Sequence, residues 1–237
     1  MPTTVEVGVD SRQVRRGMKK SITRVGAHLP EVTLHNINAV VNYLETGRWM
    51  RAHGYTPTNR VDRREEVFDA IAAEAANRAV LYLEFGVYEG RSMRYWSKLL
   101  RNPASHLHGF DSFQGLPATW TGMPPGFFST NGRIPEIEDD RVRFFPGWFE
   151  DTLPRYEPPP HEQLVVAIDS DLYSSAALVL RSLEDLMVPG TYLYFDEFHD
   201  RANELKAFDE FLERTEMRFR LVGATHELTC VAFQRMS

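Results

Sequence analysis

Residues 81–92, which read Leu-Tyr-Leu-Glu-Phe-Gly-Val-Tyr-Glu-Gly-Arg-Ser, decide the fold of this chain. A short apolar run leads to Glu84, glycines follow at Gly86 and Gly90, and an amphipathic stretch begins at Arg91. This order predicts a buried strand, a tight turn and a helix start, the geometry at which open α/β sheets bind nucleotides. A carboxylate at the strand end disfavours a phosphate ligand and favours one that carries an amine or a cationic sulfur.

Beyond this stretch short strands alternate with helices, which predicts an α/β fold with a mostly parallel sheet covered on both faces. The expected strands are rich in aromatic or branched residues and cover 81–85, 106–110, 142–145, 164–168, 191–195, 217–222 and 228–234. No helix separates the last two strands, so we expect them to form an antiparallel hairpin. The prediction is a seven-stranded sheet with a C-terminal antiparallel hairpin.

Residues 1–80 lack strand-like alternation and contain helical patches instead. Apolar residues recur at helical spacing over 32–44 in a helix expected to end at Gly47, and Asp62 is expected to cap a second helix. We therefore expect a helical N-terminal cap over 1–80 and a cofactor-binding domain over 81–237.

The composition excludes several classes of protein. Acidic residues outnumber basic ones by 33 to 27, and the net charge of −6 argues against nucleic-acid binding. The lone cysteine, Cys230, excludes an intrachain disulfide and a thiolate metal cage. No apolar run approaches the roughly 18 residues of a membrane span, and the first ten residues lack a signal-peptide core. We expect a cytoplasmic protein that acts on a small molecule, with neither nucleic acid nor membrane as a partner.

The second expected strand is followed directly by Asp111, which lies 21 residues after Gly90. An acid at this spacing can accept hydrogen bonds from both hydroxyls of a ribose, and the alternative is a helix cap or a turn-former. Gly86 and Gly90 form G-x-x-x-G and not the G-x-G-x-x-G that brings backbone against a pyrophosphate. S-adenosylmethionine, which carries no phosphate, meets these requirements. Glu84 would then organise the loop amides or receive the cofactor's amine through water.

Further residues are expected at the same cofactor. Tyr88 and Ser92 lie in the glycine turn beside the expected methionyl end, and Ser112 and Asp169 directly follow strands. Trp148 is placed to cover the adenine, with packing in the core as the alternative. The long segment 112–140 is rich in glycine, proline and aromatic residues, which favours a lid or a wall of the substrate site over disorder.

Acidic residues follow two neighbouring strands of the predicted sheet. The fourth strand is followed by Asp169-Ser170-Asp171 and the fifth by Asp196-Glu197. Because open α/β sheets place their sites at the carboxyl ends of strands, these carboxylates should lie close together, where a cation or a shared proton must compensate them. Oxygen ligands suit Mg²⁺, Mn²⁺ or Ca²⁺ better than zinc. Helix capping by Asp171, with the other acids exposed, is the alternative.

Five ordered blocks, spread over about residues 80–235, carry a resemblance to a known family. They read Glu84-Phe85-Gly86-Val87, Gly109-Phe110-Asp111-Ser112-Phe113-x-Gly115-Leu116-Pro117, Pro146-Gly147-Trp148-Phe149-x-Asp151-Thr152-Leu153-Pro154, Asp169-x-Asp171-Leu172-Tyr173 and Asp196-Glu197-Phe198. In these blocks the chain resembles the macrocin-type O-methyltransferases, class I S-adenosylmethionine enzymes that methylate sugar hydroxyls on macrolide and aminocoumarin antibiotics.

The resemblance implies a Rossmann-like class I methyltransferase fold and methylation of a sugar hydroxyl on a glycosylated natural product or other glycoconjugate. It further implies a Mg²⁺ ion held by Asp169, Asp196 and Glu197, with Asp171 as the general base. His199 follows this cluster and is expected to be a base or a substrate contact, with a surface role as the alternative. The expected partners are a small-molecule hydroxyl acceptor and further copies of the chain in a homo-oligomer.

One position departs from the family's pattern, because Asp196-Glu197 stands where the family usually has two aspartates. The extra methylene moves the carboxylate by roughly 1 Å or more, which leaves metal-independent turnover open. A metal-free methyltransferase acting on a non-sugar molecule and a non-catalytic cofactor-binding protein also stay open. A nucleotide-sugar epimerase or reductase needs G-x-G-x-x-G and Tyr-x-x-x-Lys, whereas Tyr95-Trp96-Ser97-Lys98 is one residue short.

Overall fold

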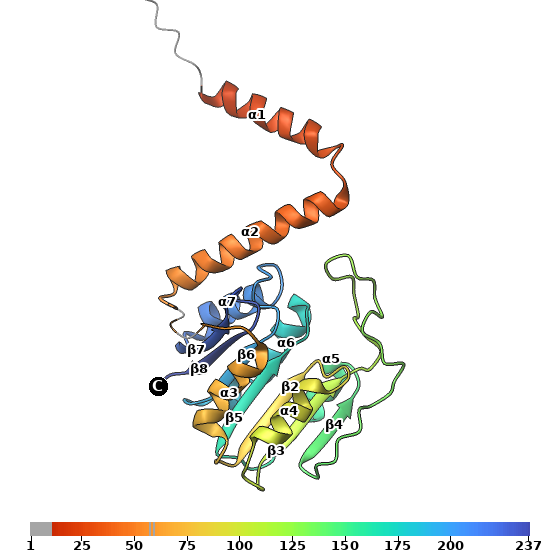
Figure 1. Cartoon of the computed structure of the whole chain (residues 1–237), viewed down its shortest axis with the longest axis vertical. Helices are drawn as coiled ribbons and strands as arrows, with labels where there is room; N and C mark the ends of the chain where they lie inside the picture. The colour runs from red at the N-terminus through yellow and green to blue at the C-terminus, as the bar shows by residue number, and fades with distance from the viewer. Residues whose placement is uncertain (1–10, 57, 59) are drawn as a thin grey trace, which may run out of the picture. The chain divides into compact units, whose positions relative to one another are not determined.

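The computed structural model describes residues 11–56, 58 and 60–237 of the chain (Figure 1). The chain divides into two compact units, and the boundary lies between Val41 and Asn42. The first unit contains α1 (Ser11–Gly26) and the start of α2 (Glu31–Ala52). The described residues between 42 and 80, which we grouped with the helical cap, lie in the same unit as the sheet.

A single eight-stranded sheet forms the centre of the second unit, in the order β1-β7-β8-β6-β5-β2-β3-β4. Its strands are β1 (Arg60–Val61), β2 (Val80–Phe85), β3 (His106–Asp111), β4 (Val142–Pro146), β5 (Gln163–Ile168), β6 (Tyr192–Phe195), β7 (Phe219–Thr225) and β8 (Val231–Arg235). β8 is antiparallel to β6 and β7, whereas the other paired strands are parallel. The predicted mostly parallel sheet with a C-terminal antiparallel hairpin is confirmed. The additional edge strand, β1, escaped prediction because two residues are too few to show an alternation.

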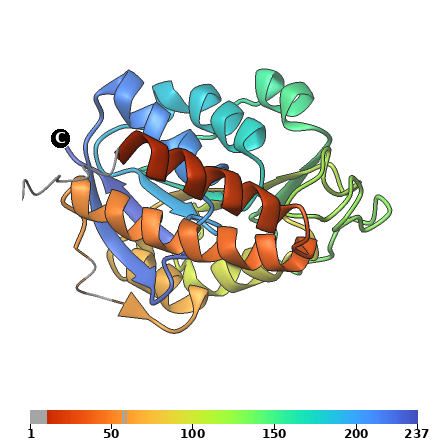
Figure 2. The ribbon, with the colours of Figure 1, turned by 90° about the horizontal axis from the view of Figure 1, so that it is seen from above.

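Helices cover both faces of this sheet (Figure 2). On one face lie α3 (Arg64–Ala75) and α4 (Arg91–Leu99), and on the other lie α5 (Phe149–Thr152), α6 (Tyr173–Ser182) and α7 (Glu204–Thr215). Short 3-10 turns, η1 (Leu153–Arg155) and η2 (Glu184–Leu186), follow α5 and α6. None of the helices in the described part of the chain combines the length and the apolarity needed to cross a bilayer.

Alternating side chains on the central strands build a separate core on each face. On β5, Val166 and Ile168 belong to the core beneath α6 and α7, whereas Val165 and Ala167 belong to the core beneath α3 and α4. This follows from the period of two in a strand, which sends successive side chains to opposite faces. The strand ends are therefore held rigidly from both sides, which is what a site built on them requires.

The helix α2 continues beyond Gly47, where the sequence predicted its end. Met50 is buried, and the indole Nε1 of Trp49 donates a hydrogen bond to Asp209 Oδ1 at 2.6 Å. These tertiary contacts outweigh the roughly 1 kcal/mol that a glycine costs inside a helix.

The start of α3 also differs from the prediction, because its N-cap is Arg63 and not Asp62. The carboxylate of Glu66 accepts hydrogen bonds from the backbone N–H groups of both residues, at 3.2 Å from Asp62 and 3.0 Å from Arg63. An acid within the first turn therefore binds the backbone amides of the two residues that precede the helix, as the glutamate of a capping box does. This local geometry sets the position of the next residue, Arg64.

Replacing Met50 by alanine tests whether the end of α2 is part of the sheet's core. Met50→Ala should lower the free energy of unfolding by about 2–5 kcal/mol, because the side chain is buried. Arg48→Ala, at an exposed position in the same turn of the helix, is the control and should change it by no more than about 0.5 kcal/mol. Urea titration of both variants measures the difference. Equal stabilities would show that this part of α2 does not pack on the sheet.

Candidate active site

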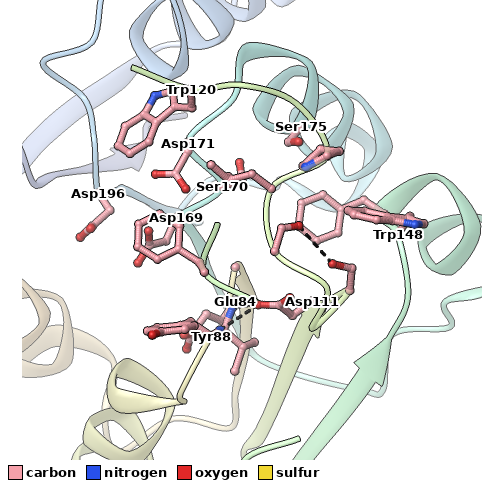
Figure 3. Close-up of a pocket in the computed structure, with 18 of the residues that line it drawn as sticks. Glu84, Tyr88, Asp111, Trp120, Trp148, Asp169, Ser170, Asp171, Ser175 and Asp196 are labelled. Atoms are coloured by element: carbon pink, nitrogen blue, oxygen red, sulfur yellow. Dashed lines mark hydrogen bonds between the residues drawn. The ribbon is translucent and has the colours of Figure 1, made fainter. Parts of the chain in front are cut away.

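A cavity of about 650 Å³ opens beyond the carboxyl ends of β2, β3, β5 and β6 (Figure 3). The strand order reverses between β2 and β5, and open α/β sheets bind ligands beside such a reversal. The described residues that line the cavity include every predicted site residue except Gly90 and His199: Glu84, Gly86, Tyr88, Ser92, Asp111, Ser112, Trp148, Asp169, Asp171, Asp196 and Glu197. Residues chosen from separate strand ends are thus brought together in one place.

Gly86 lets the turn after β2 touch the end of β5. Its φ is 98°, and a Cβ atom there would lie 1.7 Å from the carbonyl oxygen of Asp169. Gly90, with a φ of 71°, is the N-cap of α4, so it shapes the helix start. Between them Tyr88 holds a φ of 50°, a conformation that costs a residue with a side chain about 1–3 kcal/mol and tends to occur at functional sites.

The carboxylate of Asp111 organises the loop that follows β2. Its Oδ2 accepts hydrogen bonds from the backbone N–H groups of Val87 and Tyr88, both at 2.8 Å, as Figure 3 indicates. Its Oδ1 accepts the N–H of Phe113 at 2.6 Å. Of the two roles expected for Glu84, Asp111 takes that of holding the loop amides. The other role, receiving the cofactor's amine, stays a prediction. A carboxylate has about four acceptor sites, so room for one further donor remains.

Glu84 is buried between the turn and the core. Its Oε2 accepts a hydrogen bond from the hydroxyl of Tyr82 at 2.9 Å. Burial raises the pKa of Glu84 to about 8, although this hydrogen bond and Arg64 oppose the shift. A carboxyl group with such a pKa is largely protonated at neutral pH when no cation lies beside it, and a cationic ligand in the cavity would favour its ionised form.

The two acidic strand ends meet at the cavity, as predicted, and a cation joins them. Arg64 Nη1 donates to Asp169 Oδ2 at 3.2 Å and to Asp196 Oδ1 at 3.0 Å. Burial, and next the charge of Asp196, raise the pKa of Asp169 well above its ordinary value. The sequence offered no signal for Arg64, because a single arginine at a helix start looks like an ordinary surface residue.

Asp171 projects toward the cavity beside these acids (Figure 3). It does not cap α6, whose N-cap is Leu172 with no side-chain cap bond, so the capping alternative is wrong. Its φ is 61°, again in the left-handed region. Burial, followed by the charges of Asp196 and Asp200, raises the pKa of Asp171 to about 7. A carboxyl group with this pKa can accept a proton near neutral pH, as a general base must.

Glu197 lies beside His199. Its Oε2 lies 3.2 Å from His199 Nδ1, and among the described residues that nitrogen has no hydrogen-bond partner. Burial raises the pKa of Glu197 to about 8 and lowers that of His199, so both shifts favour an uncharged pair. The histidine ring stacks on Tyr43 at a centroid distance of 4.9 Å. His199 does not itself line the cavity, whereas Glu197 does.

The expected magnesium ligands do not converge on one point. Asp169 and Asp196 share Arg64, while Glu197 contacts His199. Across the described ranges, no group of three or more histidine, cysteine or acidic side chains is placed to hold a metal ion. Mg²⁺ requires near-ideal octahedral geometry, so this arrangement of donors does not fit it.

A fully buried acid that sequence reasoning missed, Glu204, ties the two acidic loops together. Its Oε1 accepts the backbone N–H of Ser170 at 3.2 Å, and its Oε2 accepts that of Glu197 at 3.1 Å. Glu204 has no exposed surface, and it lies at the start of α7. Its sequence context is that of any acid in the first turn of a helix, so no local signal could have revealed the role.

The segment 112–140 forms a wall of the cavity. Trp120 is nearly buried and packs with Leu116 and Leu172. Leu172 directly follows Asp171 in the loop after β5. Phe128 meets the ring of Tyr88 edge-on at 5.6 Å, above the glycine turn. On another side of the cavity lies Trp148, the N-cap residue of α5 (Figure 3). The cavity thus has aromatic walls around an acidic floor.

Comparison with known proteins agrees with the resemblance read from the sequence blocks. A family model described as Macrocin-O-methyltransferase (TylF) matches residues 128–235. The 8-demethyl-8-(2,3-dimethoxy-alpha-L-rhamnosyl)-tetracenomycin-C 4'-O-methyltransferase of Streptomyces olivaceus is 27% identical over 168 residues, which are 62% of this chain and 63% of that protein. The mycinamicin III 3''-O-methyltransferase of Micromonospora griseorubida is 33% identical over 39% of this chain and 34% of its own length. The chain thus aligns with less than two thirds of the length of these curated relatives.

Solved structures agree with the fold. The O-methyltransferase NovP matches with a TM-score of 0.56 and 24% identity, over 73% of this chain and 78% of that one. CalS11, a calicheamicin methyltransferase, also matches with a TM-score of 0.56, at 18% identity, over 98% of this chain and 99% of that one. The predicted Rossmann-like class I methyltransferase fold is confirmed by these neighbours.

Replacing Gly86 by alanine tests the close contact between the glycine turn and β5. Gly86→Ala should lower the free energy of unfolding by about 3 kcal/mol or more, because both backbone strain and overlap with the Asp169 carbonyl oppose it. Gly122→Ala is the matched control, because its φ is also positive, at 87°, but no atom of the described residues lies within 4 Å of the added Cβ. It should cost only the backbone strain, about 1–2 kcal/mol. Similar losses in urea titrations of the two variants would argue against the contact.

Replacing Glu84 by glutamine tests the burial of its carboxyl group. The folded-state pKa of about 8 lies above the ordinary 4.5, so the wild-type carboxyl opposes folding increasingly as the pH rises between these values. Glu84→Gln should therefore gain stability relative to the wild type over this window, by the order of a few kcal/mol, and the gain should level off at higher pH. Glu89→Gln, an exposed acid on the same loop, is the control and should show no such trend. Urea titrations at several pH values measure the free energy of unfolding of each variant. A gain in stability of Glu84→Gln that does not depend on pH would contradict the raised pKa of Glu84.

Proposed function

We propose that this chain, which is similar to the macrocin O-methyltransferase family, transfers a methyl group from S-adenosylmethionine to a hydroxyl group. The proposed acceptor is a sugar hydroxyl on a glycosylated natural product. The single observation that carries the proposal is the position of Asp171. Its carboxyl group, with a pKa near 7, lines the same cavity as the glycine turn expected to receive the cofactor. A base and a cofactor turn in one cavity are the two parts that methyl transfer to oxygen requires.

The residues on the β2 and β3 side suit the cofactor. Asp111 retains acceptor capacity for a ribose hydroxyl, and Ser112 lies next to it. Glu84 suits the amine of the methionyl part, and Trp148 offers an aromatic surface for the adenine. When bound, S-adenosylmethionine supplies a methyl group on a positively charged sulfur. The volume of about 650 Å³ lies within the range of small-molecule sites.

The residues on the β5 and β6 side suit the acceptor. A sugar hydroxyl is a weak nucleophile near neutral pH and must lose its proton as it attacks. Asp171 takes that proton, and the wall of Trp120 and Leu116 excludes water and orients the acceptor. His199 does not line the cavity, so we give it no part in proton transfer. The proposal includes no metal step, because the arrangement of Asp169, Asp196 and Glu197 does not fit a magnesium ion.

The relatives support a sugar as the acceptor. The name of the Streptomyces olivaceus enzyme refers to methylation at a 4'-hydroxyl of a rhamnosyl tetracenomycin, and that of the Micromonospora griseorubida enzyme to a 3''-hydroxyl of mycinamicin III. Their alignments with this chain are partial, and the assay that follows determines the position methylated here. The homo-oligomer and the cytoplasmic location expected from the sequence stay predictions.

The assay incubates the full chain with S-adenosylmethionine and a panel of glycosylated acceptors, and detects methylated product and S-adenosylhomocysteine by mass spectrometry. We expect one sugar hydroxyl to be methylated. Binding of S-adenosylhomocysteine without turnover on any hydroxyl acceptor would instead favour a non-catalytic binding protein. Turnover only on acceptors that lack a sugar would favour a metal-independent enzyme that acts on a non-sugar molecule.

Replacing Asp171 by asparagine tests its role as the base. Asp171→Asn should lower kcat by about 10²–10⁴-fold, because the amide cannot take the proton. The affinity for S-adenosylhomocysteine, measured by calorimetry, should stay within about twofold, because the cofactor lies on the other side of the cavity. Asp151→Asn, at an exposed position on α5, is the control and should retain the wild-type rate. A near-normal kcat in Asp171→Asn would remove this residue from the mechanism.

A further inference from the structure

Arg64 reaches the acidic strand ends from outside the sequence blocks that suggest a site. It is the first residue of α3, whereas the acids follow β5 and β6. Its Nη1 nevertheless lies 3.2 Å from Asp169 Oδ2 and 3.0 Å from Asp196 Oδ1. One guanidinium nitrogen thus bridges carboxylates from two neighbouring strands, at the wall of the cavity.

The oxygen of Asp196 that faces Arg64 is held by other donors as well. Its Oδ1 accepts a short hydrogen bond from the hydroxyl of Tyr194 and a longer one, at 3.4 Å, from the thiol of Cys230. Both donors are buried. An oxygen with three donors has little capacity left for a metal ion, and an ion could bind it only by leaving buried groups unpaired.

A divalent ion at this cluster would need the place that Arg64 fills. Mg²⁺ binds oxygen ligands at about 2.0–2.1 Å, and an ion shared by Asp169 and Asp196 would have to lie between their carboxylates. The guanidinium is already there, and it keeps its positive charge at any physiological pH. Two cations that close repel each other, so the guanidinium and the ion exclude one another.

The third acid of the cluster is engaged elsewhere. Glu197 lies against His199 through Oε2, and its backbone N–H is held by Glu204 at 3.1 Å. Assembly of a three-carboxylate ligand set would therefore require Glu197 to leave His199 as well as Arg64 to leave Asp169 and Asp196. The observed contacts hold Asp169 and Asp196 on Arg64 and place Glu197 beside His199 without either movement.

We propose that Arg64 is the resident cation of this acidic cluster and that it excludes divalent ions from the position between Asp169 and Asp196. Arg64 is a positioning residue here. It holds the carboxylates of Asp169 and Asp196, which follow β5 and β6, near Asp171. Independence of methyl transfer from divalent ions is a consequence that rests on the proposed function. Exclusion of the ion from the cluster does not rest on it.

The test measures binding of Mn²⁺ alone to the full chain by electron paramagnetic resonance. The variants are Arg64→Met, which keeps the length of the side chain without its charge, and Arg64→Lys, which keeps the charge. We expect Arg64→Met to bind Mn²⁺ roughly tenfold or more tightly than the wild type and Arg64→Lys to match the wild type. Arg63→Met is the matched control, because that side chain is the immediate neighbour, is 72% exposed and pairs with Glu66 on its own helix. It should also match the wild type.

Two results would overturn the proposal. The first is wild-type Mn²⁺ binding that equals that of Arg64→Met and disappears in Asp169→Asn, because the ion would then bind with Arg64 in place. The second is an Arg64→Met variant on which Mn²⁺ has no effect. If that variant unfolds without metal, its Tm in the presence of Mn²⁺ is the readout: a rise supports the proposal and no rise opposes it.

A methyl-transfer assay in EDTA and in Mg²⁺ distinguishes failure of this inference from failure of the proposed function. With an acceptor that the wild type methylates, the rate should be the same in EDTA and in Mg²⁺. A rate that EDTA abolishes and Mg²⁺ restores would oppose the role of Arg64 while leaving methyl transfer intact. Absence of turnover on every acceptor would oppose the proposed function, and the Mn²⁺ experiment would still decide the role of Arg64.

Discussion

Buried negative charge at the carboxyl edge of the sheet is the constraint on which the rest of the site depends. Parallel strands bring acids from distant parts of the chain to one edge, and a carboxylate removed from water must find donors or take up a proton. Asp111 and Glu204 are met by backbone amides of the loops around the cavity. Asp169 and Asp196 share the guanidinium of Arg64, and Asp196 also accepts a hydrogen bond from Tyr194. The loops take their shape from these bonds, so the form of the cavity follows from the way in which its charge is compensated.

The fold could be predicted because the patterns that indicate it are formed by residues close together in the sequence. The alternation of the strands, the glycine turn at Gly86 and the acids at strand ends are all local, and the fold rules for parallel sheets then bring them together. The partners of those acids could not be predicted in this way. Arg64 lies 105 residues from Asp169 and 132 from Asp196 in the sequence, and only the packing of α3 on the sheet brings them into contact. The role of Glu204 could not be predicted for the same reason, because tertiary structure determines which loop amides it binds.

The roles of individual acids were harder to predict than their places. Glu84 and Asp111 both line the expected cavity, but the loop amides bind Asp111, because it lies at the end of the adjacent strand and its Oδ2 faces the turn. Glu197 lies at the expected edge but contacts His199, a difference that the longer side chain allows. Similarity to a family therefore predicts the fold and the position of the cavity more reliably than it predicts which residue makes each polar contact.

The chain's one cysteine takes an unusual chemical character from this edge. Cys230 is nearly buried, and its thiol donates to the carboxylate of Asp196. Burial, and next the charge of Asp196, raise the pKa of the thiol well above its usual range. Oxidants and alkylating agents react with the thiolate, so a thiol held in its protonated form reacts slowly with both. The protein therefore keeps a sulfur atom within contact of its acidic cluster without making that cluster sensitive to oxidation.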